Sequence, residues 1–154
     1  MDRTDFKILS RLQNDGRISN KSLADAVSLA PSSCSERVKQ LHQSGVIRGV
    51  HADVDPKVMG IGLEAIYFVG LTKHAREVVE NFQTQISALP EVRSTFLVSG
   101  QYDFMVHVAV RDTDHLRNLA LDYFTVRPEV TRIETVLIFD HRRNHQLPNY
   151  LGGD

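Results

Sequence analysis

The chain has 154 residues and a formal net charge of −1, with 42% hydrophobic and 24% charged residues. This composition is typical of a globular protein and leaves room for one large domain or two small ones. No apolar run reaches the ~18 residues that a membrane helix needs, and the opening segment lacks the apolar core of a signal peptide, so we expect a cytoplasmic protein without membrane contact. Cys34 is the only cysteine, which excludes an internal disulfide and a multi-cysteine zinc site.

A first helix is expected over residues 4–14. Asp2 or Thr4 can cap its start, because both side chains accept hydrogen bonds from free backbone N–H groups. Asp15-Gly16 is expected to end it. The apolar stripe of this helix consists of Phe6, Ile8, Leu9 and Leu12.

Residues 18–47 predict two further short helices joined by a tight turn. Ser19 and Asn20 are N-cap residue types that stand before an apolar group. Pro31 suits the first position of the second of these helices, because its missing N–H would have no partner there. Gly45 is expected to end that helix, since glycine takes the left-handed conformation without steric cost. Helix, turn and helix form a unit whose second helix enters the DNA major groove.

The polar face of that second helix supports DNA binding. Hydroxyl, guanidinium, ammonium and amide groups reach base edges and phosphates. The candidate DNA-binding residues are Ser32, Ser33, Ser35, Glu36, Arg37, Lys39 and Gln40. Two alternatives stay open: the unit can be an ordinary helical hairpin with a solvated face, and Arg37 can pair with an acid of the head such as Asp5 or Asp25. Cys34 is expected in the core, because it shares a helical stripe with Val38 and Leu41.

Charge is distributed unevenly along the chain. Residues 1–50 hold eight Lys or Arg and five acidic residues, a balance of +3, whereas the remainder holds ten basic and fourteen acidic residues, a balance of −4. A basic first module suits phosphate binding. Because +3 is only weakly basic, one copy should bind double-stranded DNA poorly, and we expect a homodimer or a larger assembly.

After residue 45, the sequence pattern changes from helical spacing to alternation and turn signals. Residues 46–54 alternate loosely and predict a short strand or wing, Asp55-Pro56 predicts a turn, and residues 59–62 predict a flexible joint. We therefore expect four regions: a winged helix-turn-helix DNA-binding domain over 1–52, a hinge over 53–62, an effector-binding and oligomerisation domain over 63–140, and a polar tail over 141–154.

The second domain is predicted to be a ferredoxin-like βαββαβ unit, which makes the fold class α+β. The expected strands are 63–71, 92–99, 103–110 and 130–140, and the expected helices are 75–89 and 112–124. Helices of such a unit cover one face of the sheet. The opposite face should carry Ile66, Phe68, Val136 and Ile138, and a bare face that apolar predicts a second copy as its partner.

The hairpin turn over residues 99–103 is a candidate effector site. Gly100 lets a ligand approach the backbone closely, and free N–H groups beside it can receive a carboxylate. Asp103 suits an α-ammonium group, and Tyr102 can wall a side-chain pocket, so an amino acid fits. The alternatives are a plain β-turn without a ligand and an Asp103 that bonds N–H groups of its own turn. Because one hairpin encloses little volume, we expect a neighbouring subunit to close the pocket.

The motifs of enzymes are missing from the sequence. It holds no G-x-S-x-G, P-loop or H-E-x-x-H pattern. His141 and His145 stand four residues apart, but in a polar tail without further metal ligands. We therefore expect no catalytic activity, no metal and no cofactor.

Several pieces, in order and spacing, resemble the Lrp/AsnC or feast/famine family of transcription regulators. They are MDRTDFKIL, DGRIS (15–19), LADAV (23–27), RVKQLHQSGVIRGVHADVDPKVMG (37–60), SGQYDF (99–104) and TRIETVLIF (131–139). The resemblance implies a winged helix-turn-helix, a ligand-sensing βαββαβ domain, dimers that often form octamers, and amino acids as effectors.

The resemblance also assigns residues. It implies DNA reading by the helix that carries Ser32 to Lys39, and effector binding by Ser99, Gly100, Gln101, Tyr102 and Asp103, with Thr135 or its neighbours in an adjoining subunit completing the pocket. Ala30 stands where the family often has a serine, so Ser32 or Ser33 is expected to cap the helix instead.

Two functional hypotheses follow. The favoured one is a sequence-specific DNA-binding transcription regulator that responds to a small effector, an amino acid. The alternative is a stand-alone βαββαβ small-molecule-binding or metabolic protein whose head mediates protein interaction.

Overall fold

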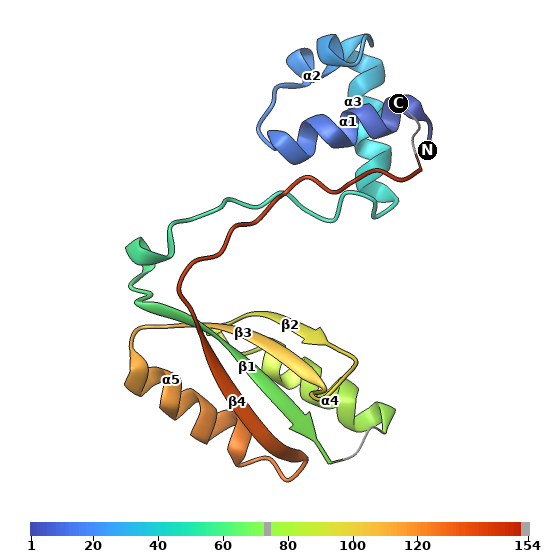
Figure 1. Ribbon diagram of the computed structural model, residues 1–154. Coiled ribbons are helices and arrows are strands. Elements are labelled where there is room, and N and C mark those ends of the chain that lie inside the picture. The colour runs from blue at the N-terminus through green and yellow to red at the C-terminus, as the bar shows by residue number, and fades with distance from the viewer. Residues whose placement is uncertain (73–74, 152–154) are drawn as a thin grey trace. The chain divides into compact units, whose positions relative to one another are not determined.

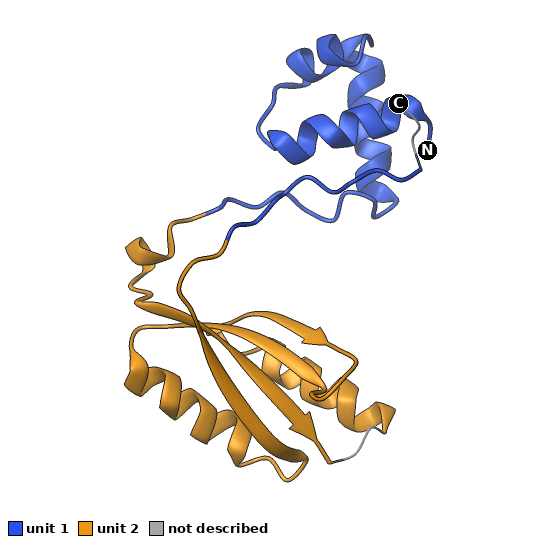
Figure 2. Ribbon diagram, viewed as in Figure 1, with its two compact units in different colours: residues 1–53, 142–154 blue, residues 54–141 orange. Residues whose placement is uncertain are grey.

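The computed structural model describes residues 1–72 and 75–151 (Figure 1). Its contacts define two compact units (Figure 2): unit 1 contains residues 1–53 and the tail that starts at Arg142, and unit 2 contains residues 54–141. Residues 152–154 of the expected tail lie outside the described residues. In the described parts of the chain, no helix is long and apolar enough to cross a membrane.

Unit 1 is a three-helix head, as expected. Its helices are α1 (Arg3–Asn14), α2 (Asn20–Ala26) and α3 (Pro31–Gln43). The core that they share consists of Ile8, Leu23, Ala24, Val27, Cys34 and Leu41. Cys34 is fully buried, which confirms it as a small core residue, and burial raises the pKa of its thiol.

The helix ends follow from side-chain capping. The Asp2 carboxylate accepts the N–H groups of Thr4 and Asp5, both at 2.9 Å, and the Asp5 carboxylate accepts the N–H of Asp2 at 2.8 Å. This capping box makes Asp2, of the two expected residues, the cap of α1 and starts the helix at Arg3. Ser19 caps α2.

The start and end of α3 depend on backbone conformation. Ala30 is its N-cap and makes no side-chain cap bond, so the expectation that Ser32 or Ser33 takes over the cap is wrong. Pro31 needs no such bond, because its own N–H is missing. Gly45 follows the helix with φ +74°, as expected for a left-handed C-terminal glycine.

Residues 46–54, expected as a short strand or wing, form no strand: all of them are described, and they adopt bends and irregular structure. A strand needs a neighbour to pair with its backbone groups, and the elements of unit 1 around this segment are helices. The alternation in the sequence was therefore not sufficient for a strand. Residues 59–62, expected as a flexible joint, overlap a 3-10 helix, Pro56–Met59, that Gly60 ends at φ +76°.

The tail is attached to α1 within unit 1. The side-chain amide of Gln146 donates to the hydroxyl of Ser10 at 3.1 Å, and the N–H of Leu147 donates to the side-chain oxygen of Gln13 at 2.8 Å.

Unit 2 has the expected βαββαβ order. Its elements are β1 (Leu63–Leu71), α4 (Arg76–Ser87), β2 (Val92–Leu97), β3 (Phe104–Val110), α5 (Thr113–Ala120), a π-helical turn (Leu121–Thr125) and β4 (Val130–Ile138). The strands form one antiparallel sheet in the order β2-β3-β1-β4. Four elements, α4, β2, β3 and β4, are shorter at their ends than expected, and the second helix ends as a π turn.

Alternation along β1 separates the two faces of this sheet. Ala65, Tyr67 and Val69 are buried and share a core with the apolar residues of both helices, among them Phe82 and Leu116. The Tyr67 hydroxyl donates to the carbonyl of Leu116, and burial raises its pKa. One face of the sheet is therefore covered by α4 and α5.

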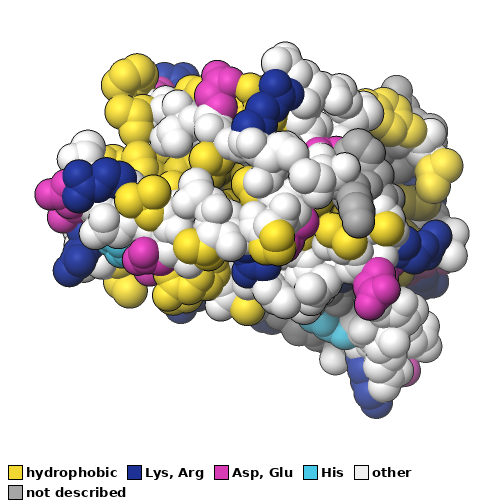
Figure 3. All heavy atoms as spheres, turned by 90° about the horizontal axis from the view of Figure 1, so that it is seen from below, with side chains coloured by type: hydrophobic (Ala, Val, Ile, Leu, Met, Phe, Trp, Pro, Cys, Tyr) yellow, Lys and Arg dark blue, Asp and Glu magenta, His cyan; other side chains and the backbone are white. Residues whose placement is uncertain are grey.

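The opposite face carries the predicted apolar residues together with charged and polar ones, among them Glu64, His107 and Glu134. Ile66 and Phe68 are paired in register with His107 and Met105 on β3, and Ile66 also with Val136 on β4. Side chains opposite each other in an antiparallel pair lie on the same face. We call this surface the open face; its most exposed apolar members include Phe96 at 52% and Val136 at 44%. Figure 3, which views the molecule from below Figure 1, shows hydrophobic side chains lying among charged and polar ones on that side.

Candidate DNA-binding and effector-binding sites

The polar face of α3 forms an open pocket of about 560 Å³, which we call the α3 pocket. Its lining consists of Ser32, Ser33, Glu36, Arg37 and Gln40. Ser35 and Lys39 lie outside this lining and are exposed. The side-chain amide of Gln40 donates to the Glu36 carboxylate at 3.4 Å, one helical turn away. Five of the seven candidate DNA-binding residues are thus brought together, and the other two flank them.

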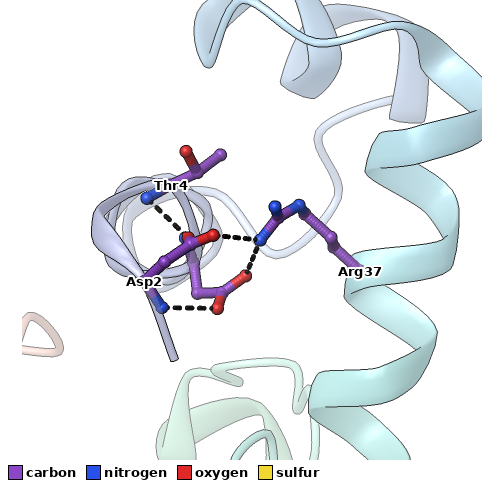
Figure 4. Close-up of polar contacts among 4 residues, drawn as sticks. Asp2, Thr4 and Arg37 are labelled. Atoms are coloured by element: carbon purple, nitrogen blue, oxygen red, sulfur yellow. Dashed lines mark hydrogen bonds and ion pairs between the residues drawn. The ribbon is translucent and has the colours of Figure 1, made fainter.

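Arg37 is held by two carboxylates of the head (Figure 4). Its Nη1 lies 2.8 Å from Oδ2 of Asp2 and 2.8 Å from Oδ1 of Asp5. These hydrogen bonds raise the pKa of the guanidinium, with Asp5 the larger contributor. The pKa of Asp2 is lowered, first by the N–H of Asp5 and then by Arg37. The pairing of Arg37 with an acid of the head, one of the two open interpretations, is therefore present.

The sequence predicts Asp2 only as a helix cap and does not predict its pairing with Arg37 of α3. The local pattern of acids at positions 2 and 5 is a capping-box pattern and gives no indication of a partner 35 residues further along the chain.

The hairpin turn in unit 2 has the glycine geometry expected of it. Gly100 has φ +127°, and a Cβ built there would meet no heavy atom within 4 Å. The turn is closed by the N–H of Val98, which donates to the carbonyl of Asp103 at 2.9 Å. Backbone at Gly100 is therefore open to an approaching group.

The Asp103 carboxylate is bonded to β1. Its Oδ2 accepts the N–H of Leu71 at 2.6 Å, and the backbone N–H of Asp103 donates to the carbonyl of Val69 at 2.9 Å. The sequence offered two roles for this carboxylate, an α-ammonium partner and a bond to its own turn. The structure adds a third: Asp103 fixes the hairpin to the end of β1, one of the two inner strands of the sheet.

Beside the turn lies an open pocket of about 560 Å³, which we call the hairpin pocket. Its lining consists of Phe68, Leu97, Val98, Ser99, Gln101, Tyr102 and Met105. The rings of Phe68 and Tyr102 are 5.4 Å apart. Of the predicted effector residues, Ser99, Gln101 and Tyr102 line this pocket directly, and they add polar groups to an otherwise apolar wall.

Two residues of β4 beside the hairpin pocket were missed by the sequence reasoning. The Tyr102 hydroxyl donates to the Glu134 carboxylate, which raises the pKa of Tyr102. Arg132 donates to the carbonyl of Gln101, and its guanidinium carbon lies 4.2 Å from the centre of the Tyr102 ring. Their alternation with apolar Ile133 in a predicted strand indicates that they share one face of the sheet, but it does not indicate that this face meets the hairpin turn.

Thr135 lies on the other side of the sheet from these residues. It pairs in register with Tyr67, whose side chain is in the core, whereas Glu134 pairs with Phe68 on the open face. Within one chain, Thr135 is therefore not brought together with the hairpin turn.

The two units together define a helix-turn-helix head joined to a ligand-binding type of βαββαβ domain. Residues 1–48 match a family model of winged helix-turn-helix DNA-binding domains, and residues 64–147 match that of the Lrp/AsnC ligand binding domain. The chain belongs to the Lrp/AsnC family, as its sequence motifs indicate.

Known proteins similar to this chain agree with that assignment. The HTH-type transcriptional regulator AldR of Mycolicibacterium smegmatis is 40% identical over 93% of this chain and 84% of its own. The leucine-responsive regulatory protein of Escherichia coli is 34% identical over 91% of this chain and 85% of its own. A Neisseria meningitidis transcriptional regulator, solved as a complex with L-Met, superposes with a TM-score of 0.87 at 30% identity, covering 96% of each chain.

Proposed function

We propose that this chain is a sequence-specific DNA-binding transcription regulator, without a catalytic step of its own, whose activity responds to an amino acid. The observation that carries the proposal is the α3 pocket, a cluster of polar and charged side chains on the second helix of a helix-turn-helix. Similarity to named transcriptional regulators over nearly the whole chain supports the same conclusion.

For DNA reading, the α3 pocket supplies groups of the right chemistry. Ser32 and Ser33 lie in the first turn of α3, the part of a recognition helix that contacts base edges. Glu36 and Gln40 add an acceptor and an amide on the same face. We propose that these four residues face the bases and that exposed Ser35 and Lys39 contact phosphates.

For the effector, we propose the hairpin pocket. Its apolar wall includes Phe68, Leu97 and Met105 and suits an apolar amino-acid side chain. Backbone N–H groups in the turn from Ser99 to Gln101 can donate hydrogen bonds to the carboxylate of the ligand. The L-Met complex of the Neisseria regulator and the name of the Escherichia relative support an effector of this class.

We further propose that the pocket is completed by a second copy of the chain, with Thr135 or its neighbours contributing from the adjoining subunit. The open face, on which Phe96 and Val136 are about half exposed, is the surface for a homodimer. Dimerisation doubles the phosphate contacts of a weakly basic head. Further assembly to octamers rests on the family resemblance alone.

The test is retention of duplex DNA on a gel by the full chain, across a salt series. A duplex selected from a random pool should be retained, with affinity falling steeply as salt rises. Calorimetry with the twenty amino acids should find an apolar one that binds and changes that affinity. A chain that binds an amino acid but retains no duplex at low salt would favour the alternative, a small-molecule-binding protein whose head serves protein interaction.

A further inference from the structure

We propose that Arg37 is a positioning residue, which orients α3 through Asp2 and Asp5 and does not itself contact DNA. The inference rests on the proposed DNA binding and deepens it, because it removes one candidate from the reading face and gives it another role. It also extends the DNA-binding machinery to the first residues of α1.

Arg37 joins two elements that are distant in sequence. It comes from the middle of α3, three residues after buried Cys34, and reaches the N-terminal turn of α1. There, one nitrogen bonds both carboxylates of the capping box. Asp2 and Asp5 are themselves fixed by the backbone N–H groups of the helix start. The guanidinium is therefore held by two carboxylates whose positions are already fixed by the start of α1, independently of Arg37.

The same side chain borders the α3 pocket. Arg37 follows Ser33 by four residues and precedes Gln40 by three, so all three lie on one side of the helix. Fixing Arg37 to α1 fixes the rotation of α3 about its own axis and hence the direction in which Ser33 and Gln40 point. Recognition needs side chains held close to their productive geometry.

A switch of Arg37 to a phosphate would leave these carboxylates without their cation. The Asp5 side chain is only 14% exposed, and that of Arg37 only 34%. Separating one partner from a poorly exposed ion pair leaves a charge that is neither well solvated nor paired, which is unfavourable. Both acids would also bring negative charge toward DNA once Arg37 no longer neutralised them. Lys39 is exposed, so a contact with a phosphate would neither break such an ion pair nor leave these two acids unneutralised beside DNA.

The two roles of Arg37 predict opposite effects of removing an acid. If Arg37 reads DNA, Asp5→Asn frees it and removes a negative charge, so DNA should bind more tightly. If Arg37 positions α3, Asp5→Asn should bind DNA more weakly despite the favourable charge change. Asp25→Asn is the matched control, because Asp25 is an exposed acid of the same head and carries the same charge change.

We expect Asp5→Asn and Arg37→Ala to weaken binding of the selected duplex by about tenfold each, and the double variant to be little worse than either, since the residues act as a unit. The slope of log affinity against log salt should stay that of the wild type. Arg37→Lys, which keeps a cation in reach of the acids, should recover part of the affinity. Thermal unfolding of each variant identifies the fraction that is folded at the assay temperature.

Three results would overturn the inference. They are tighter binding by Asp5→Asn than by Asp25→Asn, a salt slope reduced by about one in a folded Arg37→Ala variant relative to wild type, and additive losses in the double variant. Failure of the proposed function looks different, because the wild type itself would then show no salt-dependent retention of duplex DNA.

Discussion

The Asp103 carboxylate accepts the backbone N–H of Leu71 at 2.6 Å, so the residue that ends the hairpin turn is fixed to a strand 32 residues earlier in the chain. This bond satisfies an N–H at the end of β1, beyond the residues that pair with β3. It links the conformation of the turn, where we place the effector, to β1.

Replacing Asp103 with Ala should therefore destabilise unit 2 by about 1–3 kcal/mol, the usual effect of leaving a partly buried N–H without its acceptor. Denaturant unfolding measures the loss. Asp103→Asn separates structure from charge, because its amide oxygen can still accept the Leu71 N–H. If Asn restores stability but calorimetry finds no amino-acid binding, the charge contacts the ligand; if Asn restores both, Asp103 acts only on the turn.

Gly100 should not tolerate a side chain, although there is space for one. Its φ of +127° is a conformation that L-residues rarely adopt, and strain of this kind costs about 1–3 kcal/mol. Gly100→Ala should lower stability by that amount or shift the turn, and amino-acid affinity should fall with it. Gly60→Ala is the control, because Gly60 also has a positive φ, +76°, and open space at its Cβ position, but lies outside the hairpin turn; it should lower stability and leave amino-acid affinity unchanged. A Gly100→Ala variant with wild-type stability and affinity would show that the turn relaxes at no cost.

His107 should make unit 2 less stable in mild acid. It lies on the open face with Nε2 3.2 Å from a Glu64 oxygen, and burial, the dominant cause, lowers its pKa. Glu64 opposes that shift, whereas His141 and Arg93 add to it. Because the pKa of His107 is lower in the folded protein, the unfolded chain binds the proton more readily. The free energy of unfolding is therefore highest above the ordinary histidine pKa of about 6.5 and falls as the pH drops below that value.

The measurement is the unfolding midpoint of unit 2 between pH 8 and pH 5, for wild type and His107→Gln. Between pH 8 and pH 5, the unfolding midpoint of His107→Gln should fall less than that of wild type. His42→Gln, at an exposed histidine of α3, is the control, and its midpoint should fall as much as that of wild type. A decrease that is the same in all three proteins would assign the acid sensitivity to other groups.

These features differ in how far the sequence predicted them. Among the described residues, periodic apolar residues located every α-helix and every strand, and Pro31 and Gly45 marked the ends of α3, because both signals act within one element. Residues 46–54, expected as a short strand or wing, form no strand, since a strand also depends on a partner for its backbone groups. Arg132 and Glu134 reach the hairpin only through the pairing of β4 with β1, a long-range relation that no local pattern contains.

The open face should control assembly. Val136 is 44% exposed on it, in register with Ile66, and burial of such apolar area contributes about 25 cal/mol per Å². Val136→Glu would place an unpaired carboxylate in the proposed interface, which is costly to bury. We expect light scattering to show a homodimer for the wild type at micromolar concentration and a monomer for this variant. Duplex affinity should fall as well, because one head supplies half of the phosphate contacts.

Leu121→Glu provides the matched control for this experiment. Leu121 is 49% exposed, close to the value for Val136, and it starts the π turn after α5, outside the strands that make up the open face. The control should leave both mass and DNA affinity unchanged. A monomeric wild type, or equal loss of assembly in the two variants, would mean that the open face is not the surface through which copies of this chain associate.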